Sequence, residues 1–148
     1  MKSNLNKKNS VFINNEQSEI ELPDKFDSLE FINRVLNYLN LTIDYIEITY
    51  LDTETIKNLN NEYFKVNSET DTISFNLTPE SDITGDIYLC PKVIKANSVE
   101  FNTGYINEFK TVIIHSILHL TGQTDTTEAS YKDMKSKQEA ILKALSNE

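Results

Sequence analysis

HSILHLTGQTD, residues 115–125, is the most informative stretch of this sequence. It holds the two histidines of the protein, His115 and His119, four positions apart. Side chains at i and i+4 lie on the same face of a helix, so two imidazoles spaced in this way can bind one metal ion. Gly122 is predicted to end the helix, and the Asp125 carboxylate can then return to a third coordination position. Three protein ligands and an open position are typical of a catalytic zinc site.

The helix that carries the histidines is predicted to run from about Ile106 to Thr121 and to be central, because apolar residues surround both imidazoles. A buried ring nitrogen without a partner is costly. Each histidine therefore either binds a metal or forms hydrogen bonds with backbone or hydroxyl groups of the core. The i, i+4 spacing, followed by glycine and aspartate, favours the metal.

Asp125 has a second interpretation. Asp125-Thr126-Thr127-Glu128 fits the capping-box pattern, in which Asp125 would cap a final helix predicted from roughly Thr127 to Leu145. Thr127 can cap that helix equally well, which would leave Asp125 free to bind metal. On spacing alone, capping and ligation are equally compatible with Asp125.

Away from this motif, the hydrophobic pattern predicts strand, helix, strand, helix, strand, strand and then helices. This order is typical of an α/β or α+β fold with a small mixed sheet. The last two strands follow each other closely and are expected to pair antiparallel. Strands are predicted within Ser10–Leu22 (one strand or two short ones), Asp44–Leu51, Thr70–Leu77 and Gly85–Cys90, and further helices from a cap at Ser28 to Leu39, from Thr53 to Phe64 and from Pro91 to about Asn102.

The length of 148 residues is that of one domain, which we expect over residues 10–148 after a flexible tail at residues 1–9. A domain of this size buries a core without a structural metal, so a bound metal would serve chemistry. Cys90 is the single cysteine, which excludes an internal disulfide and a multi-cysteine zinc site. We expect it to be a small buried hydrophobe.

Charge and local sequence argue against several functions. The formal net charge of −9 disfavours broad electrostatic capture of nucleic acid, although it leaves room for a local basic patch. No apolar run is long enough to cross a bilayer, and the basic N-terminus lacks the apolar region of a signal peptide, so we expect a cytoplasmic location and no membrane partner. Ser116 stands where HExxH zinc proteases carry their general-base glutamate, which disfavours that class.

These motifs resemble those of the YbeY endoribonucleases, a family of rRNA maturation factors. The family signature H-G-x-L-H-L-x-G-Y-D-H is similar to residues 115–125, with Asp125 at the place of the third histidine, where some branches also carry aspartate. The family blocks L-N-x-x-Y-R and T-D-V-L-S-F are similar to residues 59–64 and 70–75, and the G-D-I strand to residues 85–87. The resemblance covers roughly residues 10 to 145.

Three positions depart from the family pattern. Phe64 replaces an arginine thought important for activity, and phenylalanine cannot stabilise phosphate charge as a guanidinium does. Ser116 replaces a glycine and Gln123 a tyrosine. These departures bear on catalytic efficiency more than on the fold or the metal.

The resemblance implies an α+β fold with α/β-like order, in which about five helices pack around a mixed four-stranded sheet. It implies a metal-dependent endoribonuclease that hydrolyses RNA phosphodiesters with a metal-activated water, in ribosomal RNA maturation and ribosome quality control. Our working hypothesis is that His115, His119 and Asp125 hold one Zn²⁺, with other divalent ions as alternatives. Ribosomal RNA and ribosomal particles are the expected partners, and a monomer is the favoured oligomeric state.

Asp71 is the candidate catalytic side chain beyond the metal site, because it can orient a ligand or line the cleft. The alternative is a turn at the entry to its strand. Asn60, Tyr63 and Lys65 are candidate RNA contacts. The alternative is an ordinary solvated helix face with Tyr63 in the core, which we favour for Tyr63.

Two other functions stay open at this point. The first is a non-enzymatic ribosome-assembly factor with a structural or vestigial metal site, and the loss of the arginine at Phe64 favours it. The second is a metal hydrolase that acts on another substrate, such as a small phosphoester or an amide.

Overall fold

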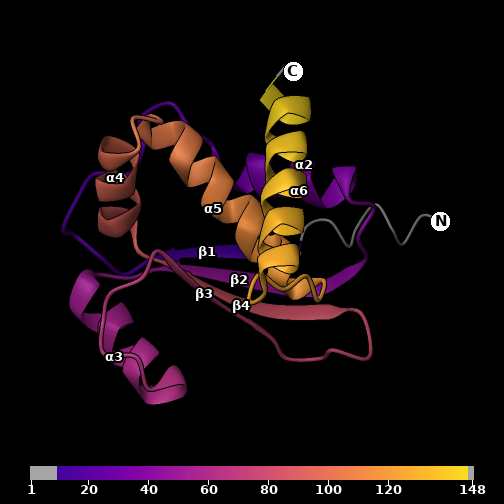
Figure 1. Cartoon of the computed structure of the whole chain (residues 1–148), viewed down its shortest axis with the longest axis horizontal. Coiled ribbons are helices and arrows are strands. Elements are labelled where there is room, and N and C mark those ends of the chain that lie inside the picture. Colours follow the sequence, from indigo (N-terminus) through magenta and orange to yellow (C-terminus); the bar gives the residue numbers. More distant parts are fainter. Residues whose placement is uncertain (1–9, 147–148) are drawn as a thin grey trace.

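Four strands form one mixed sheet in the computed structural model, which describes residues 10–146 (Figure 1). The sheet has the order β1-β2-β4-β3, in which β1, β2 and β4 are parallel and β3 is antiparallel to β4, as predicted for that pair. β3 is therefore an edge strand. The predicted tail at residues 1–9 lies outside the described residues. The strands are β1 (Val11–Asn15), β2 (Ile43–Tyr50), β3 (Thr72–Asn76) and β4 (Ile83–Leu89).

Five helices complete the described part of the chain, and Figure 1 shows α3 on one side of the sheet and the other four on the opposite side. The α+β fold expected from the sequence, with a mixed four-stranded sheet and about five helices, is confirmed. No helix within residues 10–146 combines the length and apolarity needed to span a membrane. The helices are α2 (Ser28–Tyr38), α3 (Thr53–Phe64), α4 (Pro91–Glu100), α5 (Tyr105–Leu120) and α6 (Glu128–Ser146).

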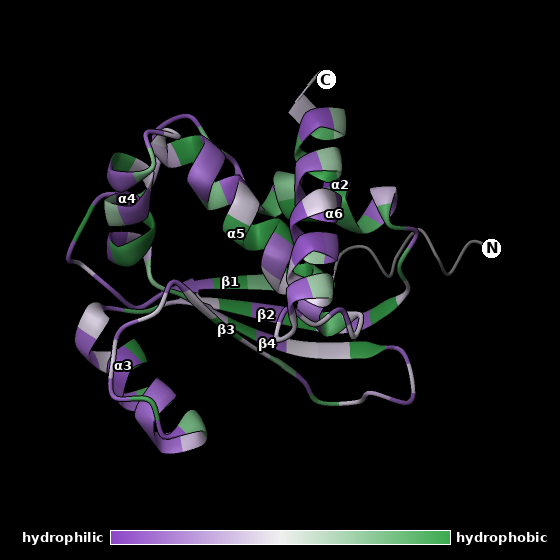
Figure 2. Ribbon diagram, viewed as in Figure 1, coloured by the Kyte–Doolittle hydropathy of each residue, from purple (hydrophilic) through white to green (hydrophobic). Residues whose placement is uncertain are grey.

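The sheet buries side chains on both faces, but unequally. The larger core lies between the sheet and helices α2, α5 and α6, and includes Ile48 and Ile114. A smaller cluster under α3 includes Ile56, Ile73 and Cys90, and Cys90 is fully buried, as predicted. In Figure 2 the outer helices α3 and α6 carry many hydrophilic residues, whereas the strands show hydrophobic segments interspersed with hydrophilic ones. The central helix α5 is held in position by the larger core, to which it contributes buried side chains.

The prediction of strand structure beyond Asn15 is wrong, because the backbone there finds a local partner. The Gln17 side chain accepts hydrogen bonds from the N–H groups of Glu19 (3.1 Å) and Ile20 (3.2 Å) and donates one to the Ile20 carbonyl (3.1 Å). A side chain that satisfies the backbone in this way replaces the ladder of a second strand. The alternation of apolar residues in this segment does not reveal such bonds.

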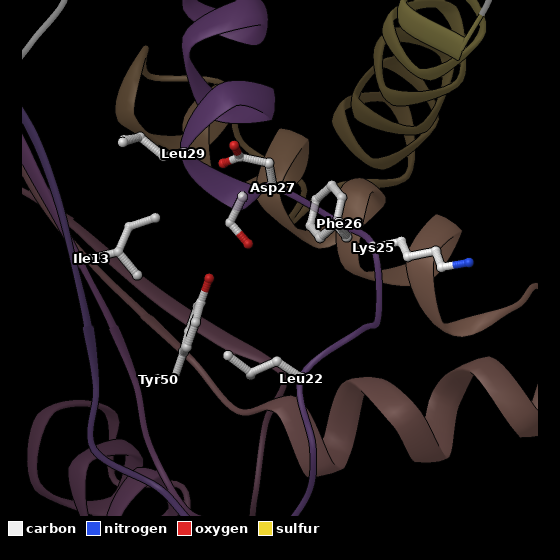
Figure 3. Close-up of a pocket in the computed structure, with 8 residues that line it drawn as sticks. Ile13, Leu22, Lys25, Phe26, Asp27, Leu29 and Tyr50 are labelled. Carbon is white, nitrogen blue, oxygen red and sulfur yellow. The ribbon is translucent and has the colours of Figure 1, made fainter.

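The predicted cap of α2 is also shifted by one residue. Asp27 caps the helix and accepts a hydrogen bond from the Glu30 N–H (3.1 Å), and Ser28 is the first helical residue. Figure 3 shows the surface pocket beside this cap, of ≈ 600 Å³, in which the Tyr50 hydroxyl points toward the start of α2. Burial raises the pKa of Tyr50, against the lowering effect of a hydrogen bond with Ser28. Leu22, from the segment after β1 that does not form a strand, also lines this pocket.

Candidate metal centre

Helix α5 holds the two histidine rings against each other. The Nε2 atoms of His115 and His119 are 3.0 Å apart, and the ring planes meet at 77°. Two imidazole nitrogens that face each other at this distance either share a proton or bind one cation. The side chains are 25% and 31% exposed, so a ligand from solvent can reach them.

The chain reverses direction immediately after the second histidine. Gly122 has φ 97°, a conformation that glycine adopts readily, and its N–H donates to the His119 carbonyl (3.0 Å). The Gln123 N–H donates to the Leu118 carbonyl (3.2 Å). These two bonds form the Schellman motif that ends many helices, and they confirm the predicted end of α5 at Gly122.

Thr127, rather than Asp125, caps the final helix. α6 begins at Glu128, and the Ser130 N–H donates to Thr127 Oγ1 (3.0 Å) while the Thr127 N–H donates to Ser130 Oγ (3.0 Å). This reciprocal pair resembles a capping box in which serine takes the place of glutamate. The capping interpretation of Asp125 is therefore wrong, and its carboxylate is free to turn toward α5.

Asp125 completes a triangle with the two histidines. Its Oδ2 atom lies 3.4 Å from His115 Nε2 and 3.7 Å from His119 Nε2. In a tetrahedral zinc site with metal–ligand distances of about 2.0–2.1 Å, any two ligand atoms are about 3.4 Å apart. The separations of 3.0, 3.4 and 3.7 Å scatter around that value. Two imidazoles and one carboxylate at these distances fit a divalent metal and leave a fourth position open.

Gln138 on α6 contacts the ring nitrogen of His115 that does not face His119. A hydrogen bond joins His115 Nδ1 to Gln138 Oε1, and an amide oxygen can only accept, so Nδ1 carries the proton. The lone pair of Nε2 is then directed at the metal position. The sequence reasoning missed this residue. The sequence could have indicated it, because Gln138 is a polar residue on the same face of α6 as the buried Met134 and Ile141.

Burial and neighbouring charge tune the titratable groups of the site. Burial, followed by the proximity of His115, lowers the pKa of His119, which keeps its ring in the neutral form that binds metal. Burial raises the pKa of Asp71, while the charge of His115 acts in the opposite direction. Asp71 lines the same pocket as the three ligands, so its carboxyl is within electrostatic reach of His115.

A pocket of ≈ 450 Å³ opens beside the three ligands and extends across the edge strand β3. The structure brings Asp71 and Asn60 into its wall, together with Phe64. Asn60 is also structural, because its Nδ2 donates to the Ser68 carbonyl (3.1 Å) in the loop after α3. The pocket is lined by Asn60, Phe64, Thr70, Asp71, Thr72, Ile73, Ser74, His115, His119 and Asp125.

Two predicted RNA contacts lie outside that wall. Lys65 is the C-cap of α3 in the left-handed conformation (φ 60°) and is exposed. Tyr63 is 57% exposed, so its expected place in the core is wrong. The apolar stripe of α3 reaches the core through Ile56 and Leu59, whereas Tyr63 packs on the ring of Phe75 of β3 (5.3 Å) and keeps most of its side chain exposed.

Comparison with known proteins identifies the family. The sequence profile described as "Endoribonuclease YbeY" matches residues 12–146. The chain belongs to the YbeY family. The endoribonuclease YbeY of Karelsulcia muelleri is 32% identical over 126 residues, which are 85% of this chain and 89% of that protein. The YbeY of Christiangramia forsetii is 32% identical over 123 residues, 83% and 86% of the two chains.

A solved structure shares the fold of this chain. The solution structure of TM1509 from Thermotoga maritima superposes with a TM-score of 0.56 at 21% identity and covers 93% of this chain and 92% of that one. At this identity the likeness concerns the fold alone.

Two departures from the YbeY signature have structural roles here. Ser116 is fully buried, its Oγ lies 2.7 Å from Thr72 Oγ1, and it donates to the Val112 carbonyl (2.8 Å). It therefore ties α5 to the edge strand β3. Gln123 Oε1 accepts a hydrogen bond from Lys137 Nζ (2.6 Å), which ties the metal-site turn to α6.

Proposed function

We propose that this protein is a metal-dependent endoribonuclease of ribosomal RNA maturation, with one Zn²⁺ held by His115, His119 and Asp125. The observation that carries this proposal is the convergence of the three ligand atoms beside an open pocket. The family supplies the reaction class, and the His-His-Asp set suits zinc, whose ligands are imidazoles and carboxylates.

The residues around the site have separable roles in such a reaction. A zinc ion bound there would supply a Lewis acid that polarises a phosphoryl oxygen and lowers the pKa of water. Gln138 holds His115 in the tautomer that presents Nε2. Asp71, whose pKa is raised by burial, is suited to take a proton from the attacking water or to give one to the leaving oxygen.

The pocket lining has no permanently cationic side chain. None of the residues that line it is a lysine or an arginine, and the whole chain carries a net charge of −9. Attraction for an RNA phosphate at this site therefore has to come chiefly from the metal. Lys65, next to the pocket wall at the end of α3, and Asn60, within the wall, remain the proposed polar contacts to RNA.

The proposal is tested by cleavage of ribosomal RNA by the purified full chain. We expect cleavage with zinc, loss of cleavage with a chelator, and loss in His115→Ala. Thr111→Ala is a matched control, because Thr111 lies one turn earlier on α5 and its hydroxyl bonds to the Asn107 carbonyl. Absence of metal-dependent cleavage by the wild type, or equal cleavage by His115→Ala, would overturn the proposal.

The setting proposed for this activity is the cytoplasm, with ribosomal particles as partners and residues 10–148 acting as one unit in a monomer. The lone buried thiol of Cys90 is compatible with a reducing compartment. Co-sedimentation with ribosomal particles tests the proposed partners, and a mass from light scattering tests the monomeric state. The alternative of a non-enzymatic assembly factor predicts co-sedimentation that survives His119→Ala without any cleavage.

A further inference from the structure

The residue that replaces the YbeY family arginine forms part of the wall of the metal pocket. Phe64 ends α3 and lines the pocket with His115 and His119, yet its side chain is 50% exposed. Burial of a phenylalanine side chain stabilises the folded state. Part of that contribution is lost here, because half of the ring is exposed beside the pocket that the metal ligands also line.

The Phe64 ring stacks on a neighbouring aromatic ring. It lies parallel to the ring of Phe75 on β3, with centroids 5.9 Å apart and an interplanar angle of 7°. Phe75 is in turn held edge-on by Tyr63 (5.3 Å) and Tyr88 (6.3 Å). Phe75 thus packs against one side of the Phe64 ring, and half of the Phe64 surface remains open to a ligand.

We propose that Phe64 is a stacking platform for one nucleobase of single-stranded RNA bound in the metal pocket. The choice of RNA rests on the proposed function. Every base offers a π-face to an aromatic ring, and stacking of this kind needs no charged side chain. It would therefore give affinity in a pocket whose lining lacks lysine and arginine. Phe64 would act on substrate position and base preference, not on the chemical step.

The test compares RNA with and without a base at the position that meets Phe64. A short fluorescent single-stranded RNA is bound to the zinc-loaded full chain, and stopped-flow anisotropy reads binding before any cleavage. One abasic residue is placed at each position of the RNA in turn. At one position the wild type should bind the intact RNA about tenfold more tightly than the abasic RNA.

Phe64→Leu keeps an apolar side chain against Phe75 but removes the flat ring. We expect it to bind intact RNA about tenfold more weakly and to lose the preference over the abasic RNA, while Phe64→Tyr retains both. Phe101→Leu is the matched control, because Phe101, the C-cap residue of α4, is 60% exposed and does not line this pocket. The salt dependence of binding should be the same in wild type and Phe64→Leu, because no ion pair is removed.

Equal RNA affinity of wild type and Phe64→Leu would overturn the platform. So would an abasic preference that persists in Phe64→Leu, or a loss that Phe64→Tyr does not restore. Thermal melts check that each variant is folded, and the half-exposed position of Phe64 tolerates both substitutions. Cleavage is scored separately, so Phe64-dependent binding without metal-dependent cleavage would reject the nuclease proposal and keep the platform.

Discussion

Replacement of Gln138 by methionine should weaken zinc binding by about 10- to 100-fold. Gln138 accepts the hydrogen bond from His115 Nδ1 and so keeps the Nε2 lone pair directed at the metal position. Methionine has a similar length and suits the apolar stripe that Met134 and Ile141 form on α6. It is only a weak acceptor, however, so the His115 ring would lose its fixed tautomer and orientation.

The expected loss corresponds to about 1.4–2.8 kcal/mol of binding free energy. We expect the lower half of this range, because two of the three ligands keep their own support. His119 retains a hydrogen bond with the backbone of Gln123, and the Schellman turn and the Thr127 cap still position Asp125. His115→Ala removes a ligand outright and should cost more than Gln138→Met.

Zinc affinity is measured by competition with a chromophoric chelator at pH 7. Gln138→Glu is the matched control, since its carboxylate keeps the acceptor and should bind zinc at least as tightly as the wild type. A zinc affinity of Gln138→Met within threefold of the wild type, in an assay that detects the loss in His115→Ala, would refute the orienting role of Gln138.

Three further predictions concern stability. In Gly85→Ala the added Cβ would lie 2.7 Å from a methyl carbon of the buried Leu120, so unfolding in urea should show a loss of about 1–3 kcal/mol. Thr127→Ala removes the cap bonded to Ser130 and should lower the same free energy by about 1 kcal/mol; an unchanged value would contradict the cap. Burial raises the pKa of Asp71, so the folded state prefers the protonated carboxyl, and stability falls as the pH rises through the folded pKa. Asp71→Asn should therefore raise the melting temperature of the metal-free protein at pH 7, and this gain should disappear below about pH 4. The same substitution should reduce cleavage. An equal melting temperature of wild type and Asp71→Asn at pH 7 would contradict the cost of burying the charged carboxylate.

The parts of the structure that could be predicted from sequence are those with local causes. The i, i+4 spacing of His115 and His119 and the glycine at position 122 act within two turns of one helix, and both features lie where expected. The antiparallel pair β3 and β4 follows from two apolar runs separated by a short polar loop. Residues 17–22 show the limit of this reasoning, because an alternating pattern does not reveal that the Gln17 side chain satisfies the backbone.

The parts that could not be predicted depend on tertiary packing. Gln138 lies 23 positions from His115, and only the packing of α6 on α5 brings the two side chains together. Asp71 could be named as a candidate, but its nearness to His115 depends on β3 lying beside α5. Tyr63 was misplaced because its helical spacing matches the apolar stripe, whereas in the structure it packs only edge-on against Phe75 of the edge strand β3 and remains 57% exposed.

The site is assembled from two halves that differ in how they are held. The ligand half consists of α5, the turn and the start of α6, and is fixed by the Schellman motif, the Thr127 cap and Gln138. The opposite half consists of the end of α3 and the edge strand β3. It carries Phe64, which departs from the YbeY pattern and lines the pocket. Because no ligand comes from that second half, a change at Phe64 can alter RNA binding while zinc affinity stays the same. Parallel zinc and RNA titrations of Phe64→Leu would test this separation, and a loss of zinc affinity equal to that of Gln138→Met would show that the halves are coupled.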